Sequence, residues 1–433
     1  MPPRRKNGCL LARVNFPLYT LQMLTSRHIL VGGGGGSSKT GVANGFEIFE
    51  LSHNGSHFVA EEVTRHETGP SVVMNCASYT DGKRTWLVAG QESHCQLYNV
   101  SSKVVHVENG EIPRRNSVLE KDGLRQRRKS ERETTKQNQP KEKVEEMKDS
   151  NSNLKSKKLQ LVVKPADSIQ TDFGKSEALQ RIVRISTCGK LMATGGTDGH
   201  IRIWAFPRLE KLHEIEAHAK EIDDIDFSRN SKTLGTIAKD GRALLWSVDK
   251  GVMDKELTWS RGDGAKYMYK RLRFARPCDD RSKDQLFTLS NSIISKNLSY
   301  LQLWDTQSGN ILKSVGFSET LSAMAVSDDG KFVAVGTMFS GSVDIFIAFS
   351  LQRALHVQSA HSMFVTGLEF LPTSLEGPAI TSNTETAVVS ISVDNRICIH
   401  SIPFRHTLPF WLVLMFIILS ICGAFVICSF LGI

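Results

Sequence analysis

A repeated phrase limits the fold of this chain more than any other feature of its sequence. The first copy reads LMATGGTDGHIRIWAFP from Leu191, and the second reads TLGTIAKDGRALLWSV from Thr233. In both copies an Asp-Gly pair precedes a tryptophan at the same offset, and Trp204 and Trp246 lie 42 residues apart. That period is within the about 40 to 45 residues of a four-stranded propeller blade. The repeat therefore predicts an all-β chain built from radially arranged sheets.

Weaker copies extend the repeat toward the C-terminus. One ends in YLQLWDT at Trp304, and another reads LSAMAVSDDGKFVAVGTMFSGSVDIFIAF. We expect the Asp-Gly pairs to supply the positive backbone dihedral angles of tight two-residue hairpins, and the tryptophans to pack between neighbouring sheets. His218 and His361, each after an alanine, resemble the Gly-His element of WD repeats. Both are therefore assigned to structure rather than to catalysis.

The strands fall into seven groups. The groups begin near the following residues: Phe16, His57, Leu179, Leu209, Val252, Ile311 and Leu351. Seven radial sheets close a ring and leave only short, protected edges. The favoured prediction is one seven-bladed WD-repeat-type propeller over residues 1–405. The alternative is two separate β domains on either side of a charged stretch, which would leave the first hundred residues with a thin core.

The charged stretch runs from about residue 101 to residue 160, where large apolar residues are sparse. Such a segment buries too little apolar area to offset its ordering entropy, so we expect a disordered insert. It falls inside one blade or between the second and third groups, at little cost because loop-closure entropy grows only logarithmically with length. The basic run RQRRK, residues 125–129, is typical of nuclear or nucleic-acid patches, but a solvated linker is the favoured interpretation.

The last residues of the chain are suited to a lipid bilayer rather than to water. No charged residue occurs from Leu408 to Ile433, and about 20 apolar residues are enough to cross a bilayer as a helix. We predict a transmembrane helix over residues 409–431, with Trp411 near its start at the membrane interface. The N-terminal apolar run is too short and too interrupted for a signal peptide, so the bulk of the chain is expected on the cytosolic side.

Five consecutive glycines from Gly32 run into SSKTG, which superficially matches a phosphate-binding loop. Such a loop needs a glycine before its lysine and a helix after it. Here Ser38 precedes Lys39, and the strand-like VANGFEIFEL follows Gly41, so nucleotide binding by this loop is not expected. A flexible hairpin tip needs only one or two glycines. Two functions stay open: carbonyls that converge on a cation, or a thin backbone that enters a cleft on a partner.

Several motifs together resemble one known family. They are FPLYTLQM, the glycine run with SSKTG, the blade MATGGTDGHIRIW, the segment GSVDIFIAFSLQ and the C-terminal anchor. The chain is similar to the prolactin regulatory element-binding protein family, the animal counterparts of a fungal membrane-bound exchange factor. The similarity covers nearly the whole chain except the charged insert. It implies a seven-bladed propeller on the cytosolic face of the endoplasmic reticulum, which activates the small GTPase that initiates COPII coat assembly.

The same resemblance implies the residues, cofactor and partners. Val42 and Asn44 match the positions with which the family's loop faces the GTPase, and a potassium ion would organise this loop. Its ligands would be backbone carbonyls of Gly33, Gly34, Gly35, Gly36, Thr40 and Gly41. The implied partners are the small GTPase, other COPII coat components and the endoplasmic reticulum membrane, crossed once. An exchange factor shifts a binding equilibrium and needs no covalent chemistry of its own, so the chain is expected to be a regulator rather than an enzyme.

Two other classes of function remain open. One is a promoter-binding transcriptional regulator with a nuclear pool, because the family takes its name from a promoter element. No helix-turn-helix, zinc or basic-zipper pattern supports nucleic-acid binding. The other is a membrane-tethered scaffold, since propellers host many binding functions. A hydrolase is not supported, because no serine, cysteine or carboxylate pair stands in a recognisable catalytic setting.

Overall fold

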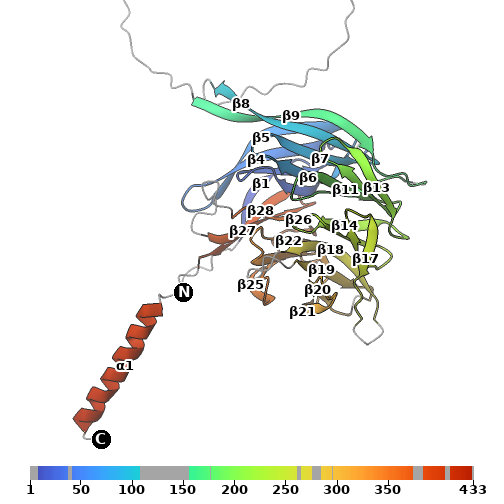
Figure 1. Ribbon diagram of the computed structural model, residues 1–433. Coiled ribbons are helices and arrows are strands. Elements are labelled where there is room, and N and C mark those ends of the chain that lie inside the picture. The colour runs from blue at the N-terminus through green and yellow to red at the C-terminus, as the bar shows by residue number, and fades with distance from the viewer. Residues whose placement is uncertain are drawn as a thin grey trace, which may run out of the picture. The chain divides into compact units, whose positions relative to one another are not determined.

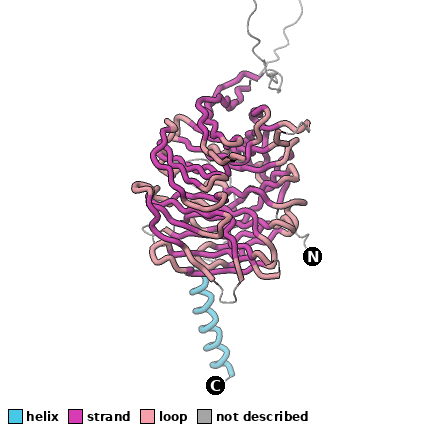
Figure 2. The backbone as a smooth tube through the Cα atoms, turned by 90° about the vertical axis from the view of Figure 1, so that its right-hand side faces the viewer, coloured by secondary structure: helices cyan, strands magenta, loops and turns pink. Residues whose placement is uncertain are grey.

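The computed structural model describes residues 8–37, 41–107, 156–175, 177–260, 265–275, 284–294, 296–373, 384–404 and 410–431. Within these ranges the protein consists of strands, the loops that join them and one helix (Figure 2). Contacts divide the chain into two units, one formed by Met1–Ser101 with Val162–Ile433 and the other by Ser102–Leu161. The propeller belongs to the first unit, and the second contains the end of β8 and the beginning of β9.

Seven four-stranded sheets form the propeller, and we number them as blades in chain order. Blade 1 contains β2 (Leu18–Met23), β3 (His28–Gly33), β4 (Asn44–His53) and β5 (Phe58–Gly69). Blade 2 contains β6 (Val73–Thr80), β7 (Thr85–Gln91), β8 (His94–Val107) and β9 (Ser156–Gln170). Blade 3 contains β10 (Gln180–Ile185), β11 (Leu191–Gly196), β12 (His200–Ala205) and β13 (Glu210–Glu216).

The remaining blades repeat the same order of strands. Blade 4 contains β14 (Ile222–Phe227), β15 (Thr233–Ala238), β16 (Ala243–Ser247) and β17 (Val252–Glu256). Blade 5 contains β18 (Tyr267–Ala275), β19 (Gln285–Ser292), β20 (Ser299–Asp305) and β21 (Ile311–Phe317). Blade 6 contains β22 (Leu321–Val326), β23 (Phe332–Thr337), β24 (Val343–Ile347) and β25 (Gln352–Val357). Blade 7 contains β26 (Val365–Phe370), β27 (Thr384–Ser392), β28 (Arg396–Pro403) and β1 (Gly8–Arg13).

The blades close into a ring. The first strand of each blade packs against the first strands of both neighbouring blades, so β2, β6, β10, β14, β18, β22 and β26 line the axis. The N-terminal strand β1 completes blade 7 by pairing antiparallel with β28 (Figure 1). Gly8 lies opposite His400, and Arg13 lies opposite Arg396. The predicted single seven-bladed propeller is confirmed, with one strand from the start of the chain in its last blade.

The sequence predicted where each of the seven strand groups begins, and several of these positions do not fall at the first strand of a blade. Five of them, near His57, Leu209, Val252, Ile311 and Leu351, fall at the outer strand of a blade and not at its inner strand. Blades instead begin at the inner strands listed above, and only the starts near Phe16 and Leu179 agree. The physical reason is that inner and outer strands both read as short β runs, and periodicity does not reveal which strand lines the axis.

The charged insert joins the third and fourth strands of blade 2. It therefore lies inside a blade, the first of the two expected positions, and not between blades. Strand structure continues to Val107 and resumes at Ser156, so the predicted limits of 101 and 160 were too wide. Residues 108–155, with the basic run 125–129 and the expected disorder, lie outside the described residues.

A buried hydrogen-bond network holds blade 4 together. Trp246 Nε1 donates to Thr236 Oγ1 at 3.0 Å, and His218 Nε2 lies 2.9 Å from the same oxygen. The other ring nitrogen of His218 lies 3.0 Å from Asp240, in the loop between β15 and β16. Burial lowers the pKa of His218, although the neighbouring carboxylate opposes that shift. The imidazole therefore serves as a neutral structural group, as the sequence predicted.

His361 has the same place in blade 7. Its Nε2 lies 2.8 Å from Ser390 Oγ and its Nδ1 lies 3.2 Å from Asp394 Oδ1, which confirms its structural role.

The Asp-Gly turns differ from the prediction in one respect. Only the glycines, Gly199 and Gly241, have positive φ, at 76° and 85°. The aspartate before each glycine instead accepts a hydrogen bond from the backbone N–H two residues on, so a side chain stabilises the turn.

Helix α1 (Phe410–Leu431) follows the propeller sequence. Its segment Phe410–Cys428 is long and apolar enough to cross a membrane, and none of it is buried against the rest of the protein. A helix satisfies its own backbone hydrogen bonds, which a bilayer interior requires. The helix agrees with the span predicted over 409–431, and Trp411 stands in its first turn. Arg405 and His406 lie outside the described residues.

Candidate functional site

The glycine-rich loop connects β3 to β4, the two central strands of blade 1, at one end of the blade. Gly34 to Ser37 and Gly41 to Ala43 belong to the described part, whereas Ser38 to Thr40 lie outside it. The segment after the loop is the strand β4, as the sequence predicted, and not the helix that a phosphate-binding loop requires. The reason for so many glycines must therefore lie in the local packing and in the part of the loop that is exposed to solvent.

Close packing requires three of the five glycines. A Cβ on Gly33 would stand 1.8 Å from the Pro17 carbonyl oxygen, and a Cβ on Gly32 would stand 2.8 Å from a side-chain atom of β2. Gly34 has φ 144°, and a Cβ there would stand 2.1 Å from Asn44 Oδ1. Protein interiors have no space to absorb such overlaps. These three glycines thus serve the structure of blade 1 and leave two of the run to be explained.

Gly36, the last glycine of the run, and Gly41, after it, are required by their backbone conformation. Gly36 and Gly41 have φ of 82° and 80°, and a Cβ on either would meet nothing within 4 Å. Glycine adopts this left-handed conformation at no steric cost, whereas other residues are strained there. Gly35 is partly buried and Ser37 is exposed. In the described part of the loop, Ser37 and Gly41 are therefore the residues exposed to solvent.

Asn44, the first residue of β4, holds the base of the loop. Its Oδ1 accepts a hydrogen bond from Gly36 N at 2.9 Å, and its Nδ2 lies 3.0 Å from the carbonyl oxygens of Gly36, Gly69 and Pro70. The side chain is only 6% exposed. Because an amide nitrogen carries two hydrogens, the three carbonyls must share them. In the free chain Asn44 fixes the loop to the β5–β6 connection, and its contact with a GTPase stays a prediction.

Val42 lies at the other end of the described loop. It is partly buried and packs against the apolar cluster between blades 1 and 7, which includes Leu18 and Ile399. Val42, two residues before Asn44, thus packs its apolar side chain against the core. Part of Val42 remains exposed and is accessible to a partner, but that contact is also a prediction that the free chain does not test.

Aromatic packing supports the strands that carry the site. Phe46 stacks on His66 with ring centroids 4.9 Å apart, and Tyr98 of blade 2 meets both rings edge-on. Burial lowers the pKa of His66, which favours the neutral ring in this stack. Burial also raises the pKa of Glu47 to about 7, although Arg65 lies 3.5 Å away and opposes the shift. Packed side chains therefore position β4 and β5 rigidly beneath the loop.

Backbone carbonyls are the ligands that potassium takes in proteins. The carbonyls of Gly36, Gly69 and Pro70 converge from two segments of chain on Asn44 Nδ2, and of these three only Gly36 belongs to the donor set that the resemblance implies. Of the donors that the resemblance implies, Gly33 ends β3 and the others are loop residues. Thr40 lies outside the described residues. The ion itself remains a proposal.

Sequence reasoning missed the partners of the loop base. Pro17, Gly69 and Pro70 all contribute carbonyl oxygens, and no side-chain pattern reports a backbone acceptor. The Gly-Pro pair at 69–70 is a turn signal, and it was the only hint of a sharp connection there. Its separation of 25 residues from Asn44 concealed the contact.

Comparison with known proteins supports the propeller assignment and adds close relatives. The family model "WD domain, G-beta repeat" matches residues 174–205, which contain β10, β11 and β12 of blade 3. A plant protein, "SEC12-like protein 1" of Arabidopsis thaliana, is 31% identical over 218 residues, which are 48% of this chain and 49% of that protein.

Two mammalian proteins match over almost their whole length. "Guanine nucleotide-exchange factor SEC12" of Mus musculus is 35% identical over 422 residues, which are 95% of this chain and 94% of that protein. The protein of the same name from Rattus norvegicus is 35% identical over 423 residues, with the same coverage. The chain therefore belongs to the SEC12 guanine nucleotide-exchange factor family, which is the prolactin regulatory element-binding protein family that the motifs indicated.

Proposed function

We propose that this protein is a guanine nucleotide-exchange factor that activates the small GTPase initiating COPII coat assembly, and so supports transport from the endoplasmic reticulum to the Golgi. The observation that carries the proposal is the near full-length similarity to two proteins named as exchange factors. The glycine-rich loop, held at its base by Asn44, supplies the candidate site. The apolar helix α1 supports a single-pass anchor in the endoplasmic reticulum membrane, with the propeller on the cytosolic side.

The reaction requires binding energy and no covalent chemistry. A GTPase with nanomolar nucleotide affinity holds its nucleotide by roughly 12 kcal/mol. An exchange factor must bind the nucleotide-free GTPase more tightly than the loaded form, which shifts the population toward release. A loop with an exposed backbone and a fixed base can enter the GTPase without first losing its own shape, and such preorganisation reduces the cost of binding.

Within this proposal Asn44 and Val42 have different roles. The buried Asn44 amide is a positioning group that keeps the loop base in place, whereas the partly exposed Val42 supplies apolar contact area. We expect Asn44→Ala to slow exchange about tenfold, since tenfold corresponds to about 1.4 kcal/mol, the size of a lost buried hydrogen-bond set. Asn44→Asp should slow it as much, because a carboxylate keeps the shape but cannot donate to three carbonyls. Val42→Ala should slow exchange by a smaller factor.

The test is stopped-flow release of a fluorescent guanine nucleotide from the coat-initiating GTPase, with the full chain in detergent micelles. Asn54→Ala is the matched control, because Asn54 is an exposed asparagine in the hairpin at the far end of β4. Melting temperatures of all variants separate slow exchange from unfolding. Normal exchange by all three site variants would remove the loop from the site, and no acceleration by the folded wild-type chain would reject the exchange function.

Potassium is tested in the same assay. If the loop carbonyls bind potassium, exchange should be faster in potassium than in sodium buffer of equal ionic strength, because the smaller ion fits such a carbonyl cage less well. Asn44→Asp should lose that preference together with the loop geometry. Equal rates in both buffers would argue against a potassium-dependent loop while leaving the exchange function intact.

The other candidate partners follow from the same proposal. We propose contacts with further COPII coat components at the endoplasmic reticulum membrane, which co-purification from micelles with and without Val42→Ala would examine. A scaffold without exchange activity would bind the GTPase but release no nucleotide. A promoter-binding role predicts DNA binding that survives at about 150 mM salt, where phosphate contacts alone weaken steeply.

A further inference from the structure

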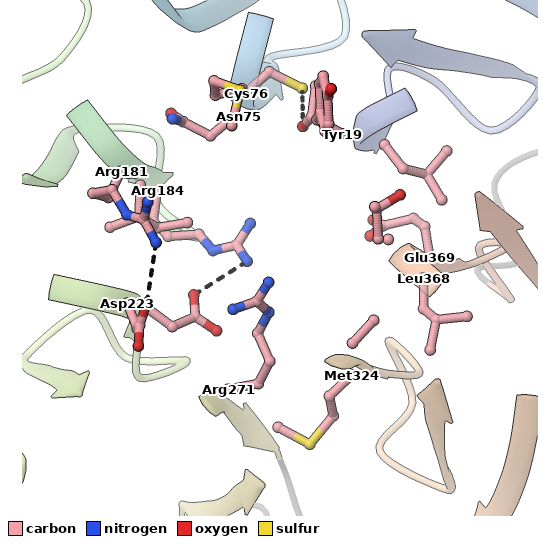
Figure 3. A pocket seen from close by; sticks show the side chains of 18 of the residues that line it. Tyr19, Asn75, Cys76, Arg181, Arg184, Asp223, Arg271, Met324, Leu368 and Glu369 are labelled. Atoms are coloured by element: carbon pink, nitrogen blue, oxygen red, sulfur yellow. Dashed lines mark hydrogen bonds and ion pairs between the residues drawn. The ribbon is translucent and has the colours of Figure 1, made fainter. Parts of the chain in front are cut away.

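A polar cavity lies on the axis of the propeller, away from the glycine-rich loop. It measures about 140 Å³, and all seven inner strands contribute to its wall (Figure 3). A wider space of about 330 Å³ shares Tyr19, Arg181 and Arg271 with it. Leu179, Met338 and Phe364, from loops that join strands, line this wider space. The two spaces share lining residues and form one recess, whose wider part, the mouth, has both apolar and charged residues in its wall.

Most charges in the recess are paired. Asp224 lies 2.6 Å from Arg273 and 3.8 Å from Arg184. Asp223 lies 3.3 Å from Arg181 and 3.8 Å from Lys270. Each of these two carboxylates therefore lies within 4 Å of two cations, and Arg271 is none of them.

Arg271 is the cation left over. Its side chain donates a hydrogen bond to the backbone carbonyl of Lys270 at 2.9 Å, and no carboxylate among the described residues lies within 4 Å of it. In Figure 3 its guanidinium points into the cavity. Burial lowers the pKa of Arg271, although the charges of Asp224 and Asp223 oppose that shift, so its positive charge is poorly solvated and only partly compensated. A half-buried charge without a carboxylate in contact is poorly solvated, so this site gains from a bound anion.

The remaining carboxylates do not cancel that charge. Glu369, on β26, accepts a long hydrogen bond from Gln22 at 3.5 Å, and burial raises its pKa to about 7. Burial also raises the pKa of Asp226, which accepts a hydrogen bond from Phe274 N. Near neutral pH, part of the negative charge that faces the arginines is therefore lost to protonation.

We propose that this axial recess binds a small free oxyanion of the phosphate and sulfate class, with Arg271 as its principal ligand. A guanidinium presents two parallel N–H groups, which match two oxygens of a tetrahedral oxyanion. The cavity has the volume of roughly four or five water molecules, enough for one such ion and little more. Lys270 and Arg181 stand at the mouth and add positive potential along the approach. The site is independent of the proposed exchange function.

The direct test is isothermal titration calorimetry of sodium sulfate into the full chain in detergent micelles, with ionic strength held constant with chloride. Sulfate is chosen because it keeps one charge state from pH 6 to 8. We expect saturable binding with a dissociation constant of about 1 mM or below, at least tenfold weaker in Arg271→Gln. Arg208→Gln is the matched control, because Arg208 is an exposed arginine in a loop, and it should bind as the wild type does.

Three further measurements keep the proposal open to refutation. Binding should tighten from pH 8 to pH 6 as Glu369 takes up a proton, and inorganic phosphate should compete with sulfate while acetate should not. In chloride buffer Arg271→Gln should melt no lower than the wild type, since it removes an unpaired charge. Absence of saturable heat in the wild type, equal binding by Arg271→Gln, or stronger competition by acetate would each overturn the proposal.

Discussion

Blades 1 and 4 each hold the loop between their second and third strands with a hydrogen-bond network, but the groups that form the two networks differ. In blade 4 the loop between the second and third strands carries Asp240, which is tied through His218 and Thr236 to the buried Trp246. In blade 1 the corresponding loop is the glycine-rich one, and the hydrogen bonds that tie its base through Asn44 are to backbone groups, one N–H and three carbonyls. Both networks are buried and both fix the start of the third strand.

The difference teaches what each loop is free to do. A side-chain network fills its own space and leaves a short turn that has little to present. A network of one amide and several carbonyls holds only the base, so a longer loop with exposed backbone extends beyond it. Blade 4 therefore resembles a rigid structural unit, whereas blade 1 combines a rigid base with a loop free to bind. Substitutions in the two blades should separate these roles.

The largest effect should come from adding one methyl group in blade 1. Gly33→Ala places a Cβ 1.8 Å from the Pro17 carbonyl oxygen, so the backbone must move, and we expect a loss of about 3 kcal/mol in unfolding free energy. Gly36→Ala is the matched variant in the same run, where only positive φ opposes the change, and should cost about 1 kcal/mol. Denaturant unfolding of both checks this. Equal losses would mean that packing does not distinguish the glycines.

An intermediate effect should come from removing the hydroxyl at the centre of the blade 4 network. Thr236→Val leaves Trp246 Nε1 and His218 Nε2 buried without their shared partner, at a cost of about 2 kcal/mol. Thr20→Val is the matched change in blade 1, where the hydroxyl meets only the weakly hydrogen-bonding thiol of Cys76, and should cost less than about 1 kcal/mol. Thermal unfolding of both variants would show whether blade 4 depends more on such side-chain bonds.

The smallest effect concerns protons in blade 7. Burial lowers the pKa of His400 to about 3, so between pH 3 and 6.5 the unfolded chain binds a proton that the folded chain does not. Stability from this group is complete above pH 6.5 and is lost as the pH falls. From pH 6.5 to 5.5 the loss should be about 1 kcal/mol, and it should be absent in His400→Phe. The difference between the two unfolding curves isolates this group, and parallel pH profiles would contradict the shift.

The extent of sequence-based prediction follows from which interactions are local. Trp204, Trp246 and the Asp-Gly turns recur at a fixed period, so the propeller and the structural roles of His218 and His361 could be predicted. The assignment of strands to the axis could not, because an inner strand and an outer strand have similar patterns. The role of β1 in blade 7 was also missed, since its partner β28 lies at the other end of the propeller sequence.

Some features of the candidate site could likewise be predicted from the sequence, and others could not. Its location in the glycine-rich loop and the positions Val42 and Asn44 came from the motif and the resemblance. The buried state of Asn44 could not be predicted, because it depends on carbonyls of Gly69 and Pro70 that no sequence pattern reports. Arg271 was missed for a related reason. It is one of several basic residues in KYMYKRLRFARP, and only the ring places it on the axis without a carboxylate partner.

The pairing of β1 with β28 sets an order of events during synthesis. The strand made first must wait, with its hydrogen bonds unmade, until the strand made last in the propeller is available, and the ring is incomplete until then. Contacts of such long sequence separation form late and slow the folding of β proteins. When β28 is complete, α1 is the next element to be made. Completion of the propeller and synthesis of the apolar helix α1 are thus brought together in time by the chain's own connectivity.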